Sequence, residues 1–442
     1  MKKRPEKLLS IGLGAYAAHA NGAKVFACEE RRRRPPGEFC KQLSIFQKEV
    51  FPMPLSDVVI LGAGAAGLMC ALTAGRRGRR VVVLDHAQRA GEKILISGGG
   101  RCNFTNTHCV PERFFSENGH FARSALTRYT AEHFLALVEK HKIAWHEKTL
   151  GQLFCDGSAR EIVDMLLAEC AAAGVEIRLQ EKIGDISRAE RYQVQTASGA
   201  YEAESLVVAT GGLSIPKIGA TDLAYRIAAQ FGLPVVPTRP ALVPFTLPPA
   251  ELERTRNLAG VSAEIVARVG KISFREGMVV THRGLSGPAI LQISSVWREG
   301  DAVEIDLLPG APEDFLLKRK RERAKAGLRS ALGEVLPQRL ADAFLPVDLA
   351  AGPIAEVPDR ALVALQSAIR TWRLHPDGTE GYTKAEVTLG GISTAGLSQR
   401  TMEARAVPGL FAIGEAVDVT GWLGGYNFQW AWASGFCAGE AA

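Results

Sequence analysis

Three consecutive glycines stand directly before an arginine, a cysteine and an asparagine in the stretch SGGGRCN, residues 97–103. Glycine runs cost backbone entropy, so they are found where a chain turns tightly or lets a ligand approach its backbone. We therefore expect a flat or phosphorylated ligand beside these glycines. Cys102 is either a weak proton donor near that ligand or a small buried apolar side chain, which is the commoner role of a free cysteine.

A second glycine motif has the GxGxxG spacing, in the segment DVVILGAGAAGLMCALTAGRRGRRVVVLD. Gly62, Gly64 and Gly67 follow an apolar strand pattern and open a helix pattern, and a second strand pattern ends at Asp85. In such a unit the glycines permit a tight turn, the approach of a pyrophosphate to the helix N-terminus and close helix–strand packing. The acidic residue binds a ribose hydroxyl. The complete unit predicts an adenine dinucleotide site.

FAD and NAD share this fingerprint, and three later segments favour FAD. The strand pattern at 206–209 runs into Thr210 and Gly211, and a strand pattern near the C-terminus ends at Gly414 and Glu415. A GGYN motif then opens a helix at 424–427. A carboxylate after a strand can bind ribityl hydroxyls, and a helix N-terminus aimed at the pyrimidine end of a flavin stabilises its reduced form.

These motifs together resemble the BaiN/RdsA (YhiN-like) family of bacterial two-dinucleotide-binding-type flavoproteins. The resemblance covers residues 57–438 and rests on the strings SGGGRCNFTN, ATGGLS, THRGLSGPA, AEVTLGGI and GYNFQWAW. It implies an α/β fold: a Rossmann-like, glutathione-reductase-like FAD-binding domain with an inserted β-barrel-like unit and a helical subdomain. It also implies that the SGGGRCN loop wraps around the flavin. The predicted cofactor-binding residues are Gly62, Gly64, Ala65, Ala66, Gly67, Asp85, Lys93, Ser97, Gly98, Gly99, Gly100, Arg101, Asn103, Thr210, Gly211, Gly414, Glu415, Gly424, Gly425, Tyr426 and Asn427.

The hydrophobic periodicity changes twice between the two halves of the predicted flavin domain. Alternating runs such as SAEIVARVG and DAVEIDLLP predict strands, and helical spacing begins near Pro312. We predict an FAD-binding domain formed by residues 53–237 and 376–442, an inserted β unit at 238–311 and a helical subdomain at 312–375.

Residues 8–30 imitate a dinucleotide fingerprint, with a GxGxxA motif that begins at Gly12. Only thirteen residues separate Gly12 from Val25, which leaves too little chain for a crossover between parallel strands. A signal peptide is a second interpretation, because a charged start precedes a short apolar run and a possible AHA cleavage site. We favour a third interpretation, in which the functional chain begins near Met53 and residues 1–52 are a dispensable extension or a misassigned start.

Charge and cysteine content limit the possible partners and compartments. The 442 residues include 53 Lys/Arg and 47 Asp/Glu, and residues 1–52 hold eleven of the bases and five of the acids, which leaves 42 of each sign. The overall charge therefore gives no reason to expect a nucleic-acid partner. The eight cysteines form no CxxC pair, which predicts reduced thiols in a cytoplasm and no metal site. No apolar run reaches the roughly 18 residues of a membrane span.

Two side chains are candidates for a catalytic acid. His282 stands in the loop THRGLSGPAIL, whose glycines and proline suggest close approach to a ligand, and histidine can move a proton near neutral pH. Cys102 is the second candidate. A further segment, residues 145–161, is expected either to line the substrate entrance or to pack as a loop; its polar residues are His146, Lys148, Gln152 and Cys155.

The run KRKRERAK, Lys318 to Lys325, holds six basic residues in eight. It is either a solvated helix face or a docking patch for a phosphate backbone. The difference matters because an RNA substrate would need such contacts.

The family resemblance implies an FAD-dependent oxidoreductase that transfers hydride from NAD(P)H through the flavin to an activated C=C bond. The most similar branch implies uridine in 23S ribosomal RNA as substrate, with dihydrouridine as product. Other members imply a small-molecule reductase or oxidase acting on an enone or amino ketone. A non-catalytic, flavin-containing RNA-binding or assembly factor is the competing class. Because a second complete GxGxxG unit is absent from the sequence, NAD(P)H would have to dock transiently near the flavin.

Overall fold

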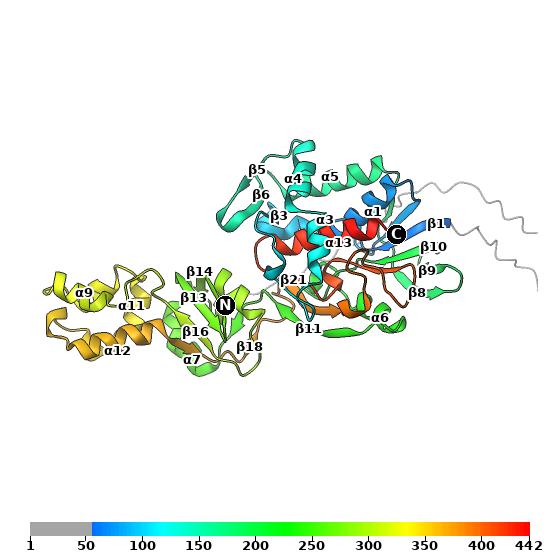
Figure 1. The fold of residues 1–442 in the computed structure, drawn as a ribbon. Coiled ribbons are helices and arrows are strands. Elements are labelled where there is room, and N and C mark those ends of the chain that lie inside the picture. Colours follow the sequence, from blue (N-terminus) through cyan, green and yellow to red (C-terminus); the bar gives the residue numbers. More distant parts are fainter. Residues whose placement is uncertain (1–54) are drawn as a thin grey trace, which may run out of the picture. The chain divides into compact units, whose positions relative to one another are not determined.

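The computed structural model describes residues 55–442, and Figure 1 shows their fold. The predictions made for residues 1–52, including the fingerprint-like and signal-peptide-like segment, lie outside the described residues. Within the described part, no helix is long and apolar enough to cross a membrane. The same residues contain no group of three or more His, Cys, Asp or Glu that could hold a metal ion.

The first of two seven-stranded sheets carries the predicted nucleotide unit. Its strands run in the order β7-β2-β1-β10-β9-β8, and β20 also pairs with β10. The pairs β7-β2, β2-β1, β1-β10 and β10-β20 are parallel, whereas β8 and β9 extend the sheet in antiparallel pairs. Val58 to Leu61 in β1 are fully buried, as expected for a parallel strand covered on both faces. The strands are β1 Leu55–Leu61, β2 Val81–Leu84, β7 Glu176–Arg178, β8 Ile183–Arg188, β9 Tyr192–Thr196, β10 Ala200–Val208 and β20 Leu410–Ala412.

Helices α1 (Ala65–Arg76) and α13 (Tyr426–Gly439) come from opposite ends of the chain and pack against each other. Glycines in α13 permit this contact, because a Cβ at Gly435 would lie 3.0 Å from the Cβ of Met69, and one at Gly439 would lie 2.7 Å from the carbonyl oxygen of Cys70. The C-terminal segment therefore completes the first domain. The neighbouring helices are α2 Glu92–Ile96, α3 Ala122–Arg128, α4 Ala131–Lys140, α5 Ala159–Ala172 and α6 Leu223–Gln230.

Three small sheets surround this core. An antiparallel sheet of three strands has the order β3-β6-β5, with β3 Asn103–Asn106, β6 Gln152–Cys155 and β5 Trp145–Glu147. Two antiparallel pairs join distant segments: β4 Phe114–Phe115 with β21 Thr420–Gly421, and β11 Val235–Ala241 with β19 Val387–Ile392.

The second seven-stranded sheet lies between the two halves of the first domain in sequence. Its order is β17-β16-β13-β14-β15-β12-β18, and each neighbouring pair is antiparallel. The order ends at β17 and β18 without pairing between them, so these described strands form an open sheet. The elements are β12 Phe245–Thr246, α7 Pro249–Thr255, β13 Ser262–Val269, β14 Ile272–Val280, β15 Gly284–Ser286, α8 Pro288–Ser294, β16 Val303–Asp306, β17 Trp372–Leu374 and β18 Gly378–Thr379.

Four helices follow β16 and share a hydrophobic core with the second sheet. They are α9 Phe315–Glu322, α10 Leu328–Leu332, α11 Gln338–Phe344 and α12 Asp359–Arg370. Ile265 and Ile305 of the sheet belong to the same buried cluster as Leu316, Leu340 and Leu362 of the helices. The domain boundaries given above stay predictions, whereas the Rossmann-like α/β fold class is confirmed.

Candidate functional site

A cavity of about 550 Å³ opens where the parallel strands of the first sheet end. Its walls include the loop after β1, the residues after β2 and β10, and the first turns of α1 and α13. Ligands of α/β proteins bind at the carboxyl ends of parallel strands, so the cavity lies where the fold places a cofactor. The predicted residues that line it are Gly62, Gly64, Ala65, Ala66, Asp85, Lys93, Ser97, Gly98, Gly99, Asn103, Thr210, Gly211, Gly414, Glu415, Gly424, Gly425 and Asn427.

The three glycines of the GxGxxG motif have three different physical roles. Gly62 has a φ of +109° and lies so close to the backbone of Ala209 that a side chain would clash with it. Gly67 does not line the cavity, but its Cα packs against the carbonyl of Gly62, which closes the helix onto the strand. A Cβ at Gly64 would meet no atom within 4 Å, so only the cavity lies above it. The open space over Gly64 is where a pyrophosphate would need the backbone to be bare.

Asp85, the predicted ribose-binding residue, also holds the loop of the GxGxxG motif in place. Its Oδ2 accepts a hydrogen bond from the N–H of Ala63 at 2.6 Å, and its Oδ1 accepts one from the N–H of Ala87 at 2.8 Å. Each carboxylate oxygen keeps a second acceptor site. Asp85 can therefore brace the first glycine loop and still accept a hydroxyl at the cavity wall.

The glycine run of the SGGGRCN stretch forms a left-handed turn. Gly98, Gly99 and Gly100 have φ values of +56°, +68° and +85°, a region that non-glycine residues enter at a cost. Gly98 also packs tightly, because a Cβ there would lie 2.9 Å from a ring carbon of Phe154. Ser97, Gly98 and Gly99 line the cavity, whereas Gly100 and the exposed Arg101 lie beyond it.

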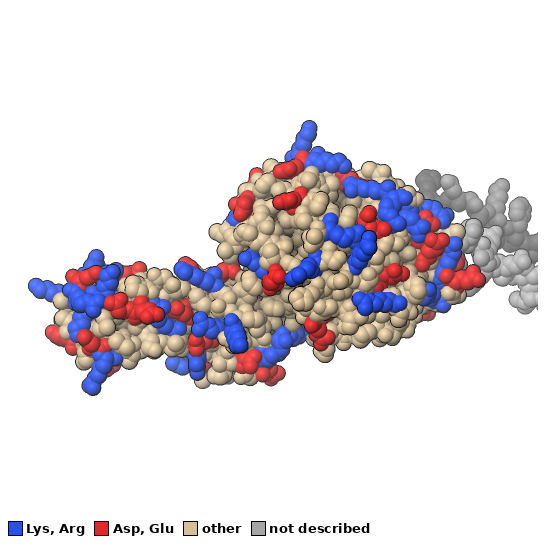
Figure 2. All heavy atoms as spheres, in the orientation of Figure 1, with Lys and Arg blue, Asp and Glu red and all other residues tan. Residues whose placement is uncertain are grey.

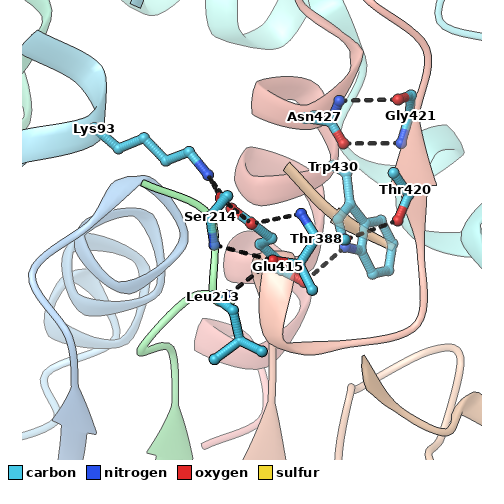
Figure 3. Close-up of polar contacts among 10 residues, drawn as sticks. Lys93, Leu213, Ser214, Thr388, Glu415, Thr420, Gly421, Asn427 and Trp430 are labelled. Carbon is cyan, nitrogen blue, oxygen red and sulfur yellow. Dashed lines mark hydrogen bonds and ion pairs between the residues drawn. The ribbon is translucent and has the colours of Figure 1, made fainter. Parts of the chain in front are cut away.

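A polar network fixes the cavity wall next to α2, as Figure 3 shows. Lys93 donates to the hydroxyl of Ser214 at 2.6 Å and forms an ion pair with Glu415. Glu415 also accepts hydrogen bonds from the Ser214 hydroxyl at 2.7 Å and from the N–H of Thr388 at 2.9 Å. Sequence reasoning did not single out Ser214 or Thr388, although both stand inside the quoted strings ATGGLS and AEVTLGGI. Their role became visible only when the fold placed them beside Glu415.

The first turn of α13 closes another wall of the cavity. Gly424 and Gly425 have φ values of +107° and +94°. The amide of Asn427 accepts from the N–H of Gly421 at 2.8 Å and donates to its carbonyl at 2.9 Å, which ties the helix start to β21 (Figure 3). Tyr426 does not line the cavity; its buried hydroxyl is hydrogen-bonded to Arg113.

The cavity has the properties that FAD requires. Asn103 Oδ1 and Thr210 Oγ1 are buried at its wall and have no hydrogen-bond partner within residues 55–442. Leaving such an atom unsatisfied costs about 1–3 kcal/mol, so a polar ligand is expected to pair with them. Open space lies over Gly64, Gly99 and Gly211, and the N-termini of α1 and α13 both favour negative charge. The residues present therefore fit a dinucleotide that carries a flavin.

The structure brings neither candidate acid to the cavity. His282 is exposed in the turn between β14 and β15, and Cys102 is fully buried at a φ of +48°. Burial raises the pKa of the Cys102 thiol. The glycines near His282 serve strand packing: a Cβ at Gly287 would lie 2.8 Å from the carbonyl oxygen of Gly277. The signal that suggested ligand approach at this loop therefore has a structural cause.

The substrate-entrance segment is only partly at the cavity. Gln152 lines the wall and accepts a hydrogen bond from Asn103 at 3.0 Å, and Phe154 lines it as well. His146 is exposed and pairs with Asp156 at 2.6 Å, whereas Cys155 is fully buried. Glu386, which sequence reasoning did not select, also lines the cavity.

Comparison with known proteins gives matches that span the described residues. The family model described as HI0933-like protein Rossmann domain matches residues 56–441. The "Ribosomal RNA dihydrouridine synthase" of Escherichia coli (strain K12) is 50% identical over 396 residues, covering 87% of this chain and 97% of that protein. The protein of the same name from Haemophilus influenzae is 45% identical, with 87% and 98% covered.

A third relative carries a different name. The "3-dehydro-bile acid delta(4,6)-reductase" of Clostridium scindens is 28% identical and covers 88% of this chain and 99% of its own length. The family match and the two higher identities agree with the site described above. The chain belongs to the HI0933-like family of Rossmann-domain proteins and is an FAD-dependent oxidoreductase.

Proposed function

We propose that this protein reduces a uridine of ribosomal RNA to dihydrouridine. The observation that carries the proposal is the 50% identity to the Escherichia coli ribosomal RNA dihydrouridine synthase over 97% of that protein's length. The 28% identity to a bile-acid reductase fits the same chemical class, since the names of both relatives imply reduction of a carbon–carbon double bond. When bound, FAD passes two electrons as hydride from a donor to such a bond.

The chain's own residues would hold the cofactor at both ends. The first turn of α1, with Gly64 at its start, would receive the pyrophosphate, and Asp85 would accept a ribose hydroxyl. The network of Lys93, Ser214 and Glu415 would face the ribityl chain, because its hydroxyls need both donors and acceptors.

The flavin end of the cavity is framed by apolar side chains. Leu242, Val387 and Leu423 form a cluster where β11, β19 and the loop before α13 meet. Trp430 closes the wall and donates its indole N–H to the carbonyl of Gly414 at 3.0 Å (Figure 3). Excluding water in this way strengthens each electrostatic contact with the reacting groups.

NAD(P)H is the proposed electron donor. The sequence contains one complete GxGxxG unit, so the nicotinamide would reach the flavin through the open side of the same cavity and leave before the RNA enters. Donor and substrate would then alternate at one site. This order predicts ping-pong kinetics.

The test combines a cellular and a purified-protein measurement. Ribosomal RNA from a strain that lacks this protein should lose one dihydrouridine by nucleoside mass spectrometry, and the wild-type gene should restore it. Under anaerobic conditions NADPH or NADH should bleach the yellow protein, and naked ribosomal RNA from the deficient strain should restore the colour. Ribosomal RNA from the wild-type strain, which already carries the modification, is the matched control.

Three outcomes separate the alternatives. The proposed function would be wrong if the deficient strain kept its dihydrouridine content and RNA failed to reoxidise the flavin. Reoxidation by a steroid enone but not by RNA would indicate a small-molecule reductase. A flavin that no donor reduces, in a protein that binds RNA tightly, would indicate a non-catalytic assembly factor.

A further inference from the structure

One carboxyl group at the cavity has no partner among residues 55–442. Most of the other titratable side chains that line it are engaged: Asp85 accepts two backbone N–H groups, Arg89 pairs with Glu92 at 3.1 Å, and Lys93 pairs with Glu415. His86 is 3.6 Å from Asp85. The carboxyl of Glu386 forms no hydrogen bond or ion pair with any residue of the described part of the chain.

Glu386 stands at the apolar end of the cavity. It directly precedes β19, and its N–H donates to the carbonyl of Leu242 at 3.2 Å. Its chain neighbour Val387 packs with Leu242 and Leu423 in the apolar cluster described above. The residue is accessible to solvent through the open cavity that it lines, although protein atoms of the cavity wall surround its carboxyl.

The surroundings of Glu386 favour its neutral form. Burial raises the pKa of its carboxyl, and the positive charge of Lys93 on α2 opposes that rise. Glu415, the other charged group beside Lys93, neutralises much of this opposing charge through its ion pair. A carboxyl that keeps its proton in a mostly apolar wall is suited to donate it.

We propose that Glu386 is the proton donor of the reaction, an assignment that rests on the proposed function. Hydride carrying two electrons goes to one carbon of the uracil C5=C6 bond, and the Glu386 carboxyl O–H gives its proton to the other carbon. The C=C π bond breaks, two C–H bonds form, and the nicotinamide donor is oxidised. The resulting carboxylate takes a proton from solvent before the next turnover.

The decisive variant is Glu386→Gln, which keeps the shape of the side chain but removes its acidic proton. We expect it to bind FAD and to be bleached by NAD(P)H as the wild type is, while reoxidation by naked ribosomal RNA slows by about 10² to 10⁴-fold. The matched control is Glu276→Gln. The carboxyl of Glu276 also has a raised pKa because of burial, but it is hydrogen-bonded to Gln292 and does not line the cavity. The control should stay within about threefold of the wild type.

Two further readouts separate proton donation from a structural role. The wild-type reoxidation rate should fall at high pH as Glu386 loses its proton, and the Gln variant should lack this limb of the profile. Independently of turnover, the absorbance of the oxidised flavin should shift with pH as Glu386 titrates, and this shift should be absent in the Gln variant. Glu386→Asp should restore both pH effects in part.

The outcomes distinguish this inference from the proposed function. If RNA does not reoxidise the wild type, the proposed function fails. If RNA reoxidises the wild type and Glu386→Gln equally fast, the assignment of Glu386 is overturned. Loss of FAD from Glu386→Gln would also overturn it, because the carboxyl would then act in holding the cofactor.

Discussion

The cofactor cavity and the helical region α9–α12 both contain conspicuous sequence motifs, but the glycine motifs of the cavity leave backbone open to a ligand, whereas most charges of the basic run are paired within the protein. In the cavity, glycines occupy conformations or close contacts that other residues would disturb. In and just after α9, five of the six basic residues of the run are in ion pairs, among them Arg319 with Glu322 and Glu334, and Arg321 with Asp314 at 2.7 Å. In Figure 2, acidic and basic side chains intermingle over this region.

A run of basic residues in the sequence therefore does not show that their charges are free to bind a phosphate. Lys320 and Arg323 are also in ion pairs, with Asp359 at 2.7 Å and Glu334 at 3.1 Å. The structure therefore favours the solvated-face interpretation of the run over a phosphate-docking patch. By contrast, Arg101 and Lys148, near the cavity, are exposed and form no ion pair with any residue in 55–442.

The largest expected effect is at Gly64. Its φ of −85° suits any residue and the space above it is open, so Gly64→Leu should fold but project a side chain where the cofactor binds. We expect the purified variant to be colourless. Gly119→Leu is the control, because Gly119 is exposed and a Cβ there also meets nothing within 4 Å. Flavin absorbance per protein measures both, and a yellow Gly64→Leu would show that the cofactor lies elsewhere.

The next effect compares ion pairs in the two regions. Glu415→Ala leaves Lys93 without its partner and two hydrogen-bond donors unsatisfied, in a site where Glu415 is only 19% exposed. We expect a loss of about 2–4 kcal/mol in the free energy of unfolding. Asp359→Ala breaks the pair with Lys320, where Asp359 is 70% exposed, and should cost less than about 1 kcal/mol. Urea unfolding of the flavin-free proteins measures both losses in the free energy of unfolding. Equal losses would contradict the expected difference between the two regions.

A third effect concerns acid stability. Glu169, with 7% of its side chain exposed, contacts Lys140 at 2.7 Å, His141 at 2.5 Å and Arg76. Burial by itself raises the pKa of this carboxyl, but hydrogen bonds from Lys140, His141 and Arg76 outweigh that effect and lower the pKa to about 2. Because the folded pKa is depressed, the stabilisation is present above the unfolded pKa near 4.5 and is lost as the pH falls towards 2.

Wild type should therefore lose roughly 2 kcal/mol from this group between pH 6 and pH 3, and Glu169→Gln should not show that loss. In the helical region, a hydrogen bond from Arg329 lowers the pKa of Asp342 in a similar way, but that pair lies at the solvent-exposed surface. Asp342→Asn should leave the pH dependence of unfolding nearly unchanged. An identical pH profile for wild type and Glu169→Gln would contradict the assignment.

The glycine and strand motifs could be predicted because their cause is local. A φ near +60° at Gly98 or the tight turn at Gly62 is a property of a few consecutive residues, and the strand patterns fixed which end of the sheet would carry them. Arg101 and Tyr426 stand inside the same motifs yet do not reach the cavity, since a motif fixes the path of the backbone better than the direction of each side chain.

The proposed proton donor could not be predicted from a local motif, because what distinguishes Glu386 is that its carboxyl has no partner among residues 55–442. Glu386 is one of 47 acidic residues, and only the three-dimensional neighbours show that it lines the cavity without a carboxyl partner in the described part of the chain. His282 was more conspicuous in sequence, since glycines and a proline accompany it. Those residues are explained by the close crossing of β14 and the start of α8, where Gly287 packs against the backbone of Gly277.

The smallest expected effect tests which cations meet RNA. Lys148 Nζ lies 5.3 Å above the ring of Phe154, a cavity-lining residue, and the carbonyl of Arg101 accepts a hydrogen bond from the N–H of Cys155. Both residues thus lie beside β6, whose Phe154 lines the cavity. Each phosphate contact contributes roughly 0.7 to 0.9 to the slope of log affinity against log salt.

Arg101→Ala with Lys148→Ala should therefore reduce that slope by about 1.5 for a ribosomal RNA fragment, and weaken binding most at low salt. The matched control replaces Arg321 and Arg323 by alanine; these are equally exposed cations, but each is held by an acidic neighbour. Their loss should leave the slope nearly unchanged, because they already have counterions within the protein. Filter binding between 50 and about 200 mM salt covers the range in which the two slopes separate. A larger change of slope in the Arg321 and Arg323 control would indicate that RNA binds at α9 and that the ion pairs there open when it binds.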